Sequence, residues 1–146
     1  MVDLVTIAVC SIGKRLFDFD FPEQKLKGFT HKAFIQCPVF SDKIPDHVEL
    51  KIVDGVGVNK SRNIAMMDCK TKYLYFADDD LTVNYKNIRE MVDQIERMDL
   101  NGVIYFGSVC DDSNKPRKHY PLSTIKLTKF NSGKYGASEM LVDVAR

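Results

Sequence analysis

Three consecutive carboxylates, Asp78, Asp79 and Asp80, are the residues of this chain whose type and spacing are best suited to chemistry. Adjacent carboxylates repel one another and raise one another's pKa unless a cation or hydrogen bonds offset the repulsion. Carboxylate oxygens are also the ligands that hard divalent cations prefer. We call these residues the acidic triplet and expect it to bind a metal that could hold a diphosphate. The alternative is that the carboxylates only cap a following helix, for which one would suffice.

The segments around the acidic triplet predict how it is positioned. Residues 73–77 are apolar and rich in aromatic side chains, which indicates a buried strand. The triplet should then emerge at the carboxyl edge of a sheet, where open α/β sheets bind ligands. Residues 85–98 carry apolar side chains at helical spacing and predict an amphipathic helix that packs on the sheet.

A glycine-containing turn that leads into a helix is the second candidate motif. Gly55 and Gly57 follow a predicted strand at 48–53 and permit positive φ or a close approach to a ligand. Asn59 is the predicted N-cap, and Arg62 would fall in the first turn, where unpaired N–H groups and a guanidinium favour an anion. Taken alone, this is an ordinary strand-to-helix turn. Beside the acidic triplet, it indicates a nucleotide diphosphate site.

The rest of the chain predicts an α/β fold with a mainly parallel sheet. Further strands are expected at 4–10, 32–37 and 102–110, a loop with a short helix at 16–30, and strands or a strand and a short helix at 123–130 and 135–144. The alternation of strands and helices favours a Rossmann-like sheet flanked by helices. A length of 146 residues with 45% hydrophobic content fits a single domain over residues 1–146.

Composition limits the classes of binding partner that we expect for the chain. The formal net charge is +1 with both signs interspersed, so we expect no nucleic-acid partner. No apolar run reaches the ~18–20 residues of a membrane span, and the N-terminus lacks a secretory pattern, so we expect a cytoplasmic chain. The four cysteines form no Cys-x-x-Cys pair and predict buried free thiols. The three histidines show no zinc-ligand spacing.

The two motifs together resemble the core of family 2 glycosyltransferases with the GT-A fold. Residues 57–65 (GVNKSRNIA) and 73–80 (YLYFADDD) resemble the family's order of a glycine, an Arg-Asn pair, a helix and a strand that ends in Asp-x-Asp. The likeness covers about residues 4–100. It implies a GT-A-type sheet, a nucleotide-sugar donor with UDP as the favoured nucleotide, and transfer to a hydroxyl acceptor with inversion.

The resemblance also implies roles for individual residues. Asp78 and Asp80 would hold Mn²⁺ or Mg²⁺ against the donor diphosphate, with Asp80 as the direct ligand and Arg62 near the nucleotide. Asp42 and Asp54 are the candidates for holding the base. The full set predicted to bind the nucleotide is Ser11, Asp42, Asp54, Asn59, Arg62, Asp78 and Asp79.

The chain departs from the family pattern in three places. The turn after the first strand is residues 11–15 (SIGKR) in place of a Thr-Tyr-Asn type, and residues 37–42 (CPVFSD) replace an Asp-Asp-Gly-Ser element. The general base of inverting members comes from a later region, where Glu139 is the candidate and an ordinary solvated glutamate is the alternative. The final run lacks a polar tail, which indicates a truncated or shortened chain. The acceptor, whether glycan, lipid or protein, is undetermined, and peripheral membrane contact is left open.

Three rival functions remain at this level. A nucleotide-sugar-binding module of the same fold would lack a general base. A nucleotidyl or phosphoryl transferase would show a glycine-rich phosphate loop, which the single glycine of residues 11–15 fits poorly. A receiver-type signalling domain would carry an acidic pair where Cys10 and Ser11 stand.

Overall fold

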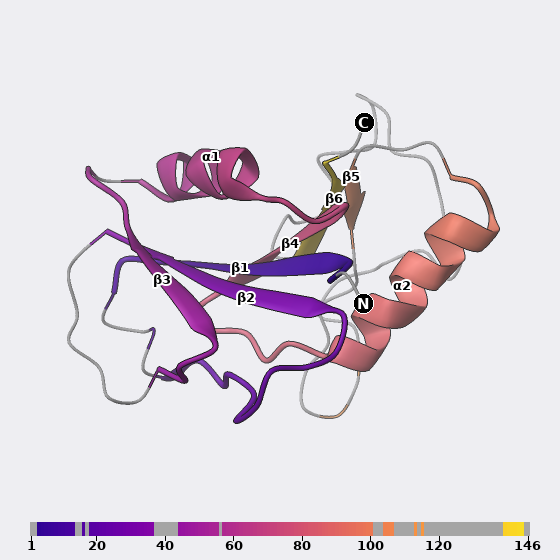
Figure 1. Cartoon of the computed structure of the whole chain (residues 1–146), viewed down its shortest axis with the longest axis horizontal. Coiled ribbons are helices and arrows are strands. Elements are labelled where there is room, and N and C mark those ends of the chain that lie inside the picture. The colour runs from indigo at the N-terminus through magenta and orange to yellow at the C-terminus, as the bar shows by residue number, and fades with distance from the viewer. Residues whose placement is uncertain are drawn as a thin grey trace.

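The computed structural model describes residues 3–13, 16, 18–36, 44–55, 57–100, 104–106, 113, 115 and 139–144. Three strands precede the first helix, and α1, β4 and α2 then follow in turn (Figure 1). Their order is β1 (Val5–Ser11), β2 (Phe29–Ile35), β3 (Val48–Ile52), α1 (Val58–Asp68), β4 (Tyr73–Asp78), α2 (Tyr85–Arg97), β5 (Ile104–Phe106) and β6 (Glu139–Asp143).

The strands form one sheet in the order β3-β2-β1-β4-β6-β5. β1 pairs in parallel with β2 and β4, and β2 pairs in parallel with β3, whereas β6 is antiparallel to both β4 and β5. The predicted α/β class with a mainly parallel sheet is therefore confirmed. In register, Cys10 lies beside both Phe34 and Asp78, so β1, β2 and β4 end at the same edge.

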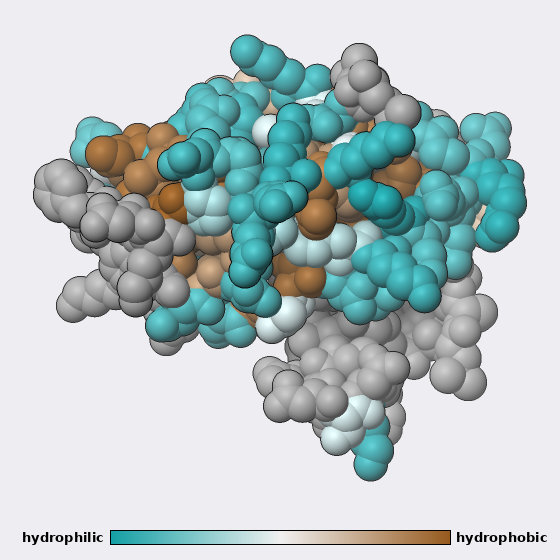
Figure 2. All heavy atoms as spheres, turned by 60° about the horizontal axis from the view of Figure 1, so that its bottom comes forward, coloured by the Kyte–Doolittle hydropathy of each residue, from teal (hydrophilic) through white to brown (hydrophobic). Residues whose placement is uncertain are grey.

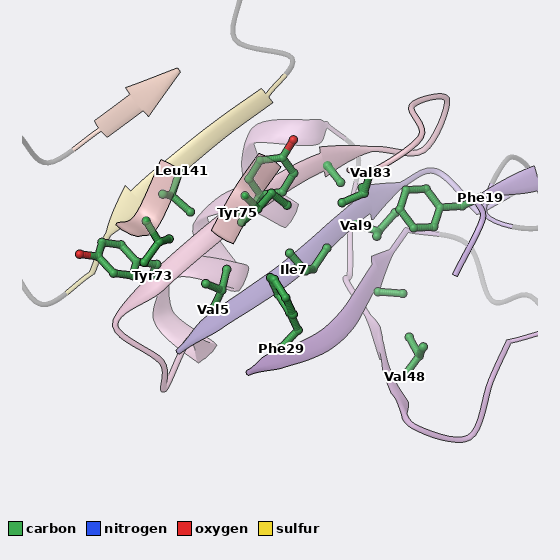
Figure 3. Close-up of a cluster of buried hydrophobic side chains, with 14 of the residues drawn as sticks. Val5, Ile7, Val9, Phe19, Phe29, Val48, Tyr73, Tyr75, Val83 and Leu141 are labelled. Carbon is green, nitrogen blue, oxygen red and sulfur yellow. The ribbon is translucent and has the colours of Figure 1, made fainter. Parts of the chain in front are cut away.

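Each face of the sheet has its own core, because alternate side chains of a strand point to opposite faces. The larger core lies on the α2 side, where the predicted apolar stripe of α2 is confirmed by the burial of Ile88, Val92 and Ile95. Figure 3 shows strand side chains that meet in this core. Those labelled from β1 and β4 are Val5, Ile7, Val9, Tyr73 and Tyr75.

Helix α1 covers the other face and is much less apolar. Of its residues only Ser61 and Ala65 are buried, and they pack with a smaller core that includes Ala8, Phe34 and Leu74. The last residue of α1, Asp68, accepts hydrogen bonds from the lysines of two neighbouring strands. Polar contacts as well as burial therefore hold α1 on the sheet.

Several predicted boundaries are wrong, each for a local reason. Strand β2 begins at Phe29 and ends at Ile35, because its pairing with β1 starts opposite Val5 and stops opposite Ser11. In the predicted loop and short helix at 16–30, Leu16 and Asp18 are 3₁₀-helical, as a short helix requires, but Phe29 and Thr30 already belong to β2. The N-cap of α1 is Gly57 and not Asn59.

The later predictions are tested only where the structure describes the chain. Of the strand expected at 102–110, β5 is described, and of the run at 135–144, β6 is a strand. The run at 123–130 lies outside the described residues, as do Cys37 and Cys110. Among the other two cysteines, both free, Cys10 is buried as predicted and Cys69 is only partly buried.

The surface is mixed. Figure 2 shows hydrophilic side chains over most of one face, with smaller hydrophobic areas between them. Within the part of the chain that the structure describes, no helix combines the length and hydrophobicity needed to cross a bilayer.

Candidate functional site

A cleft opens at the sheet edge where β1, β2 and β4 end. We call it the edge cleft. Its volume is about 370 Å³. The first turn of α1 forms one wall, and the acidic triplet at the end of β4 lies in the lining. The lining residues are Cys10, Ser11, Ile12, Gln36, Val58, Ser61, Asp78, Asp79 and Asp80. The parallel strands thus place the triplet at the carboxyl edge, as the buried run before it predicts.

Asp78 is paired with Arg62 of α1. A guanidinium nitrogen of Arg62 lies 3.0 Å from Asp78 Oδ1, and the guanidinium carbon lies 5.8 Å from the centre of the Phe76 ring. Burial raises the pKa of Asp78, the charge and hydrogen bond of Arg62 oppose this rise, and the charges of Asp80 and Asp79 add to it; the net direction is upward. Arg62 therefore offsets only part of what burial and the neighbouring carboxylates do to Asp78.

Asp79 is oriented from β1. Ser11 Oγ donates a hydrogen bond of 2.6 Å to Asp79 Oδ2 and accepts one of 3.0 Å from the backbone N–H of Gly13. The hydroxyl proton of Ser11 is thus committed to the triplet. Ser11 lines the cleft, as a nucleotide-binding residue would, and it also fixes the middle carboxylate.

Asp80 is the most exposed member of the triplet and borders two cavities. Besides the edge cleft, it lines a second cavity of about 330 Å³ together with Asp79, Leu81 and Thr82. Asp18 and Asp20, from the segment after β1, complete that lining. Asp79 and Asp80 therefore belong to the linings of both cavities.

The fit of the triplet to a divalent cation rests on the chemistry of its donors. Over the described residues, no group of three or more His, Cys, Asp or Glu side chains is arranged to hold a metal ion. Mg²⁺, however, is usually bound through one or two carboxylates, with water and substrate phosphates supplying the rest. Asp80, with Asp78 two residues before it, offers that smaller set beside the open cleft. The residues fit a cation shared with a phosphate ligand rather than an all-protein cage.

The other predicted site residues are placed less centrally. Asn59 is exposed in the first turn of α1, and Asp54 is exposed just beyond β3; neither lines the edge cleft. Asp42 lies outside the described residues. The backbone of Glu139 pairs with Ala77 across β4 and β6, next to the start of the triplet.

Two features of the site were missed from the sequence. Gln36, the first polar residue after the apolar run of β2, lines the cleft and contacts the turn before α1. Its position directly after a buried strand was the available signal. Cys10 also lines the cleft, and burial raises the pKa of its thiol to about 12. That thiol is therefore neutral at physiological pH.

The histidines are less isolated in space than in the sequence. The rings of His31 and His47 lie 5.6 Å apart, edge to face, because β2 and β3 pair there. His31 Nε2 lies 3.1 Å from the Tyr85 hydroxyl. Among the described residues no third ligand joins them in a metal-binding group.

Comparisons with known proteins bear on the family and on the fold of this chain. The family model described as glycosyl transferase family 2 matches residues 41–142. No curated protein matches the chain. The fold is similar to that of S. aureus TarS 1–349 in complex with UDP-GlcNAc, with a TM-score of 0.60 and 16% identity over 97% of this chain and 46% of that chain.

The fold is also similar to that of a second solved structure, S. aureus TarS 1–349. Its TM-score is 0.53 and its identity 15%, over 97% of this chain and 47% of that chain. At these identities the likeness concerns the fold. The chain spans less than half the length of these TarS structures.

Proposed function

This chain belongs to glycosyl transferase family 2, with the GT-A type of α/β fold, and on that premise we propose that its edge cleft binds a nucleotide-diphosphate sugar. UDP is the proposed nucleotide, and Mn²⁺ or Mg²⁺ is the proposed cofactor. The reaction we propose is transfer of the sugar to a hydroxyl acceptor with inversion at the anomeric carbon.

The charge imbalance of the edge cleft is the observation that carries the proposal. Within the described lining, the triplet gathers three carboxylates, and the guanidinium of Arg62 is paired with Asp78. A bare diphosphate would be repelled there, since like charges at short range cost free energy. A divalent cation bound first makes the same site attractive. Metal-dependent binding of a diphosphate is therefore the behaviour this geometry supports.

The residues of the chain have separate tasks in this proposal. Asp80, with Asp78, would hold the cation, and Arg62 would keep Asp78 ionised and oriented. Ser11 holds Asp79 in place. When bound, the metal would neutralise charge that develops on the departing nucleoside diphosphate. Val58 and Ser61 place the start of α1 in the lining of the cleft, and a helix N-terminus favours an anion.

Glu139 is the proposed general base. The pairing of β6 with β4 brings its backbone to the edge of the sheet where the triplet begins. A carboxylate there could take the proton from an acceptor hydroxyl as the oxygen attacks the anomeric carbon. The similar TarS structure contains UDP-GlcNAc, which supports the choice of UDP-sugars as the first donors to test.

The test is a calorimetric titration of the 146-residue chain with UDP, UDP-glucose and UDP-GlcNAc, each with and without Mn²⁺. We expect binding only with the metal. A matched control, Asp93→Asn on the exposed side of α2, should bind as the wild type does. Failure of every nucleotide to bind in the presence of metal would overturn the proposal.

A binding module without turnover is the second candidate function. It is favoured by the described lining of the edge cleft, whose carboxylates all belong to the triplet. Slow release of free sugar from the bound donor, followed by mass spectrometry over hours, separates the two functions. A transferase hydrolyses its donor slowly in the absence of an acceptor, whereas a binding module leaves it intact.

A further inference from the structure

We propose that Gln36 is a positioning residue for nucleotide binding, because its side-chain amide fixes the start of helix α1 against the edge cleft. The proposal rests on the function proposed above. Gln36 directly follows β2, and its side chain lines the cleft beside Val58 and Ser61. It touches the helix start and not the reacting atoms, so its effect is indirect.

One primary amide makes all the contacts. Gln36 Nε2 donates to the backbone carbonyl of Gly57 at 2.7 Å, and Gln36 Oε1 accepts from the backbone N–H of Gly57 at 3.1 Å. The second Nε2 hydrogen can reach Ser61 Oγ, 3.2 Å away. A donor and an acceptor lie side by side on one planar group, as an amide or a protonated carboxyl provides.

Gly57 needs such support because little else fixes it. Its φ of 115° is a conformation that side-chain-bearing residues rarely adopt, and glycine itself has no strong preference for it. As the N-cap of α1 it offers no side chain to the helix. Its carbonyl accepts the first helical hydrogen bond, from the N–H of Lys60 at 3.1 Å. The amide of Gln36 thus supplies the order that a capping side chain would give.

The backbone of Gln36 joins this contact to the carboxylates. Its N–H donates to the carbonyl of Ser11 at 3.2 Å, and the Ser11 hydroxyl holds Asp79. Arg62, which holds Asp78, lies one residue beyond Ser61 on α1. Gln36 therefore ties together the ends of β1 and β2 and the helix that carries Arg62. An error of about 1 Å in such an arrangement can cost up to ~100-fold in function.

Two substitutions of similar length separate positioning from simple packing. Gln36→Met removes every polar contact and should weaken Mn²⁺-dependent UDP binding about tenfold at every pH. Gln36→Glu at neutral pH still accepts from the Gly57 N–H but sets a negative charge against the Gly57 carbonyl. Once protonated, the carboxyl donates to that carbonyl and restores the pair, so binding should recover as the pH falls.

Affinities are compared with the wild type at each pH, because burial raises the pKa of Asp78, which lines the same cleft. All variants keep the acidic triplet and the charged residues next to this turn in the sequence, Asp54, Lys60 and Arg62. Thermal unfolding by circular dichroism checks that each variant is folded. The affinity ratio of Gln36→Glu to wild type should rise toward unity on acidification, while that of Gln36→Met stays low.

A ligand-free measurement makes the two proposals separable. The NMR chemical shift of the Gly57 amide proton should change with pH in Gln36→Glu, as residue 36 gains its proton. In the wild type the shift should keep its hydrogen-bonded value. UDP affinity of folded Gln36→Met equal to that of wild type would overturn the positioning role, as would a Gly57 titration without any change in affinity. If the wild type binds no nucleotide, the proposed function fails. The positioning role then fails too, even if the Gly57 amide proton shift follows the ionisation of residue 36 in Gln36→Glu.

Discussion

Two clusters of charged side chains lie near the two ends of helix α1, and they differ in the balance of positive and negative charge. Toward its C-terminal end, Asp68 and Glu49 face Lys32 and Lys51 of β2 and β3, so two carboxylates meet two ammonium groups. We call these four residues the β2–β3 ion network. Toward its N-terminal end, Arg62 pairs with Asp78 of the acidic triplet. The first cluster is balanced in charge, whereas the second, among the described residues, sets three carboxylates beside one guanidinium.

The pKa directions follow that difference. Burial alone raises the pKa of Asp68, but hydrogen bonds and charges from Lys32 and Lys51 outweigh it and hold the pKa below its ordinary value. For Asp78, burial and the neighbouring carboxylates outweigh Arg62, and the pKa is raised. Ionisation of Asp68 therefore stabilises the fold, whereas ionisation of Asp78 destabilises it. Such uncompensated groups in a cleft are candidates for a functional site.

The largest expected effect concerns the cluster with excess charge. Asp80→Asn removes the proposed metal ligand, and metal stabilisation of a diphosphate is worth several kcal/mol, so UDP affinity in Mn²⁺ should fall roughly 100-fold. Calorimetry measures this, with Asp93→Asn as the control. Unaltered affinity in Asp80→Asn would contradict the metal site and leave the triplet without its proposed role.

The same substitution in the balanced cluster should affect stability and not binding. Asp68→Asn leaves Lys32, whose side chain is 9% exposed, with Glu49 as its remaining partner. An incompletely paired buried charge should lower the free energy of unfolding by about 2 kcal/mol. Urea denaturation measures the loss. A large fall in UDP affinity of the folded variant would show that the β2–β3 ion network is not purely structural.

Asp78→Asn should change stability in the opposite direction. With the metal removed by a chelator at pH 7, loss of the ionised carboxylate should raise the free energy of unfolding, by an amount that the partial exposure of Asp78 keeps small. UDP affinity in Mn²⁺ should fall at the same time. Destabilisation by Asp78→Asn would show that Arg62 does compensate the triplet, and the contrast with Asp68 would be lost.

Both stability differences should shrink in acid, for opposite reasons. The folded-state pKa of Asp68 is lowered, so its contribution is present above the unfolded pKa and is lost as the pH falls through the folded value. The folded-state pKa of Asp78 is raised. Its favourable contribution to stability is therefore present below the unfolded pKa and is lost as the pH rises through the folded pKa. Denaturation curves of both variants from pH 7 to below 3.8, the ordinary pKa of an aspartate side chain, test these signs.

The smallest effect should come from the residue that orients Asp79. Ser11→Ala removes one hydrogen bond to a carboxylate, so UDP affinity should fall by about two- to fivefold, or ~0.5–1 kcal/mol. Thr6→Val is the matched control in the same strand, because the Thr6 hydroxyl bonds Thr71 instead. Thr6→Val should lower stability without changing affinity. Equal affinities for the two variants would remove Ser11 from the site.

The sequence predicted the locations of the buried strands and of helix α2 correctly, but it predicted the residues that join these elements less well. The runs that became β1, β4 and α2 were found because their apolar spacing is local and their burial leaves few alternatives. The N-cap of α1 was misplaced, since Asn59 has the side chain typical of a cap. Gly57 takes that position because its backbone is held by Gln36, 21 residues away in the chain.

The candidate site divides in the same way. The triplet and Arg62 were identified in advance, because carboxylates after a buried strand and a basic residue after a glycine turn are visible in sequence order. Their pairing was not foreseen, and neither was the hydrogen bond from Ser11 to Asp79, which spans 68 residues. Asp54 and Asn59 have suitable side chains, yet the fold leaves them outside the lining of the edge cleft.

The sequence by itself determined the strand that carries the triplet, the helix that follows the glycine turn, and the excess of carboxylates at their junction. These depend on residue type and local periodicity, which the unfolded chain already contains. The tertiary structure alone decided which carboxylates are compensated. Charge balance depends on distances between strands that are remote in sequence. Pairing of β2 with β3 gives Asp68 two lysines, and pairing of β1 with β4 brings a serine hydroxyl to Asp79.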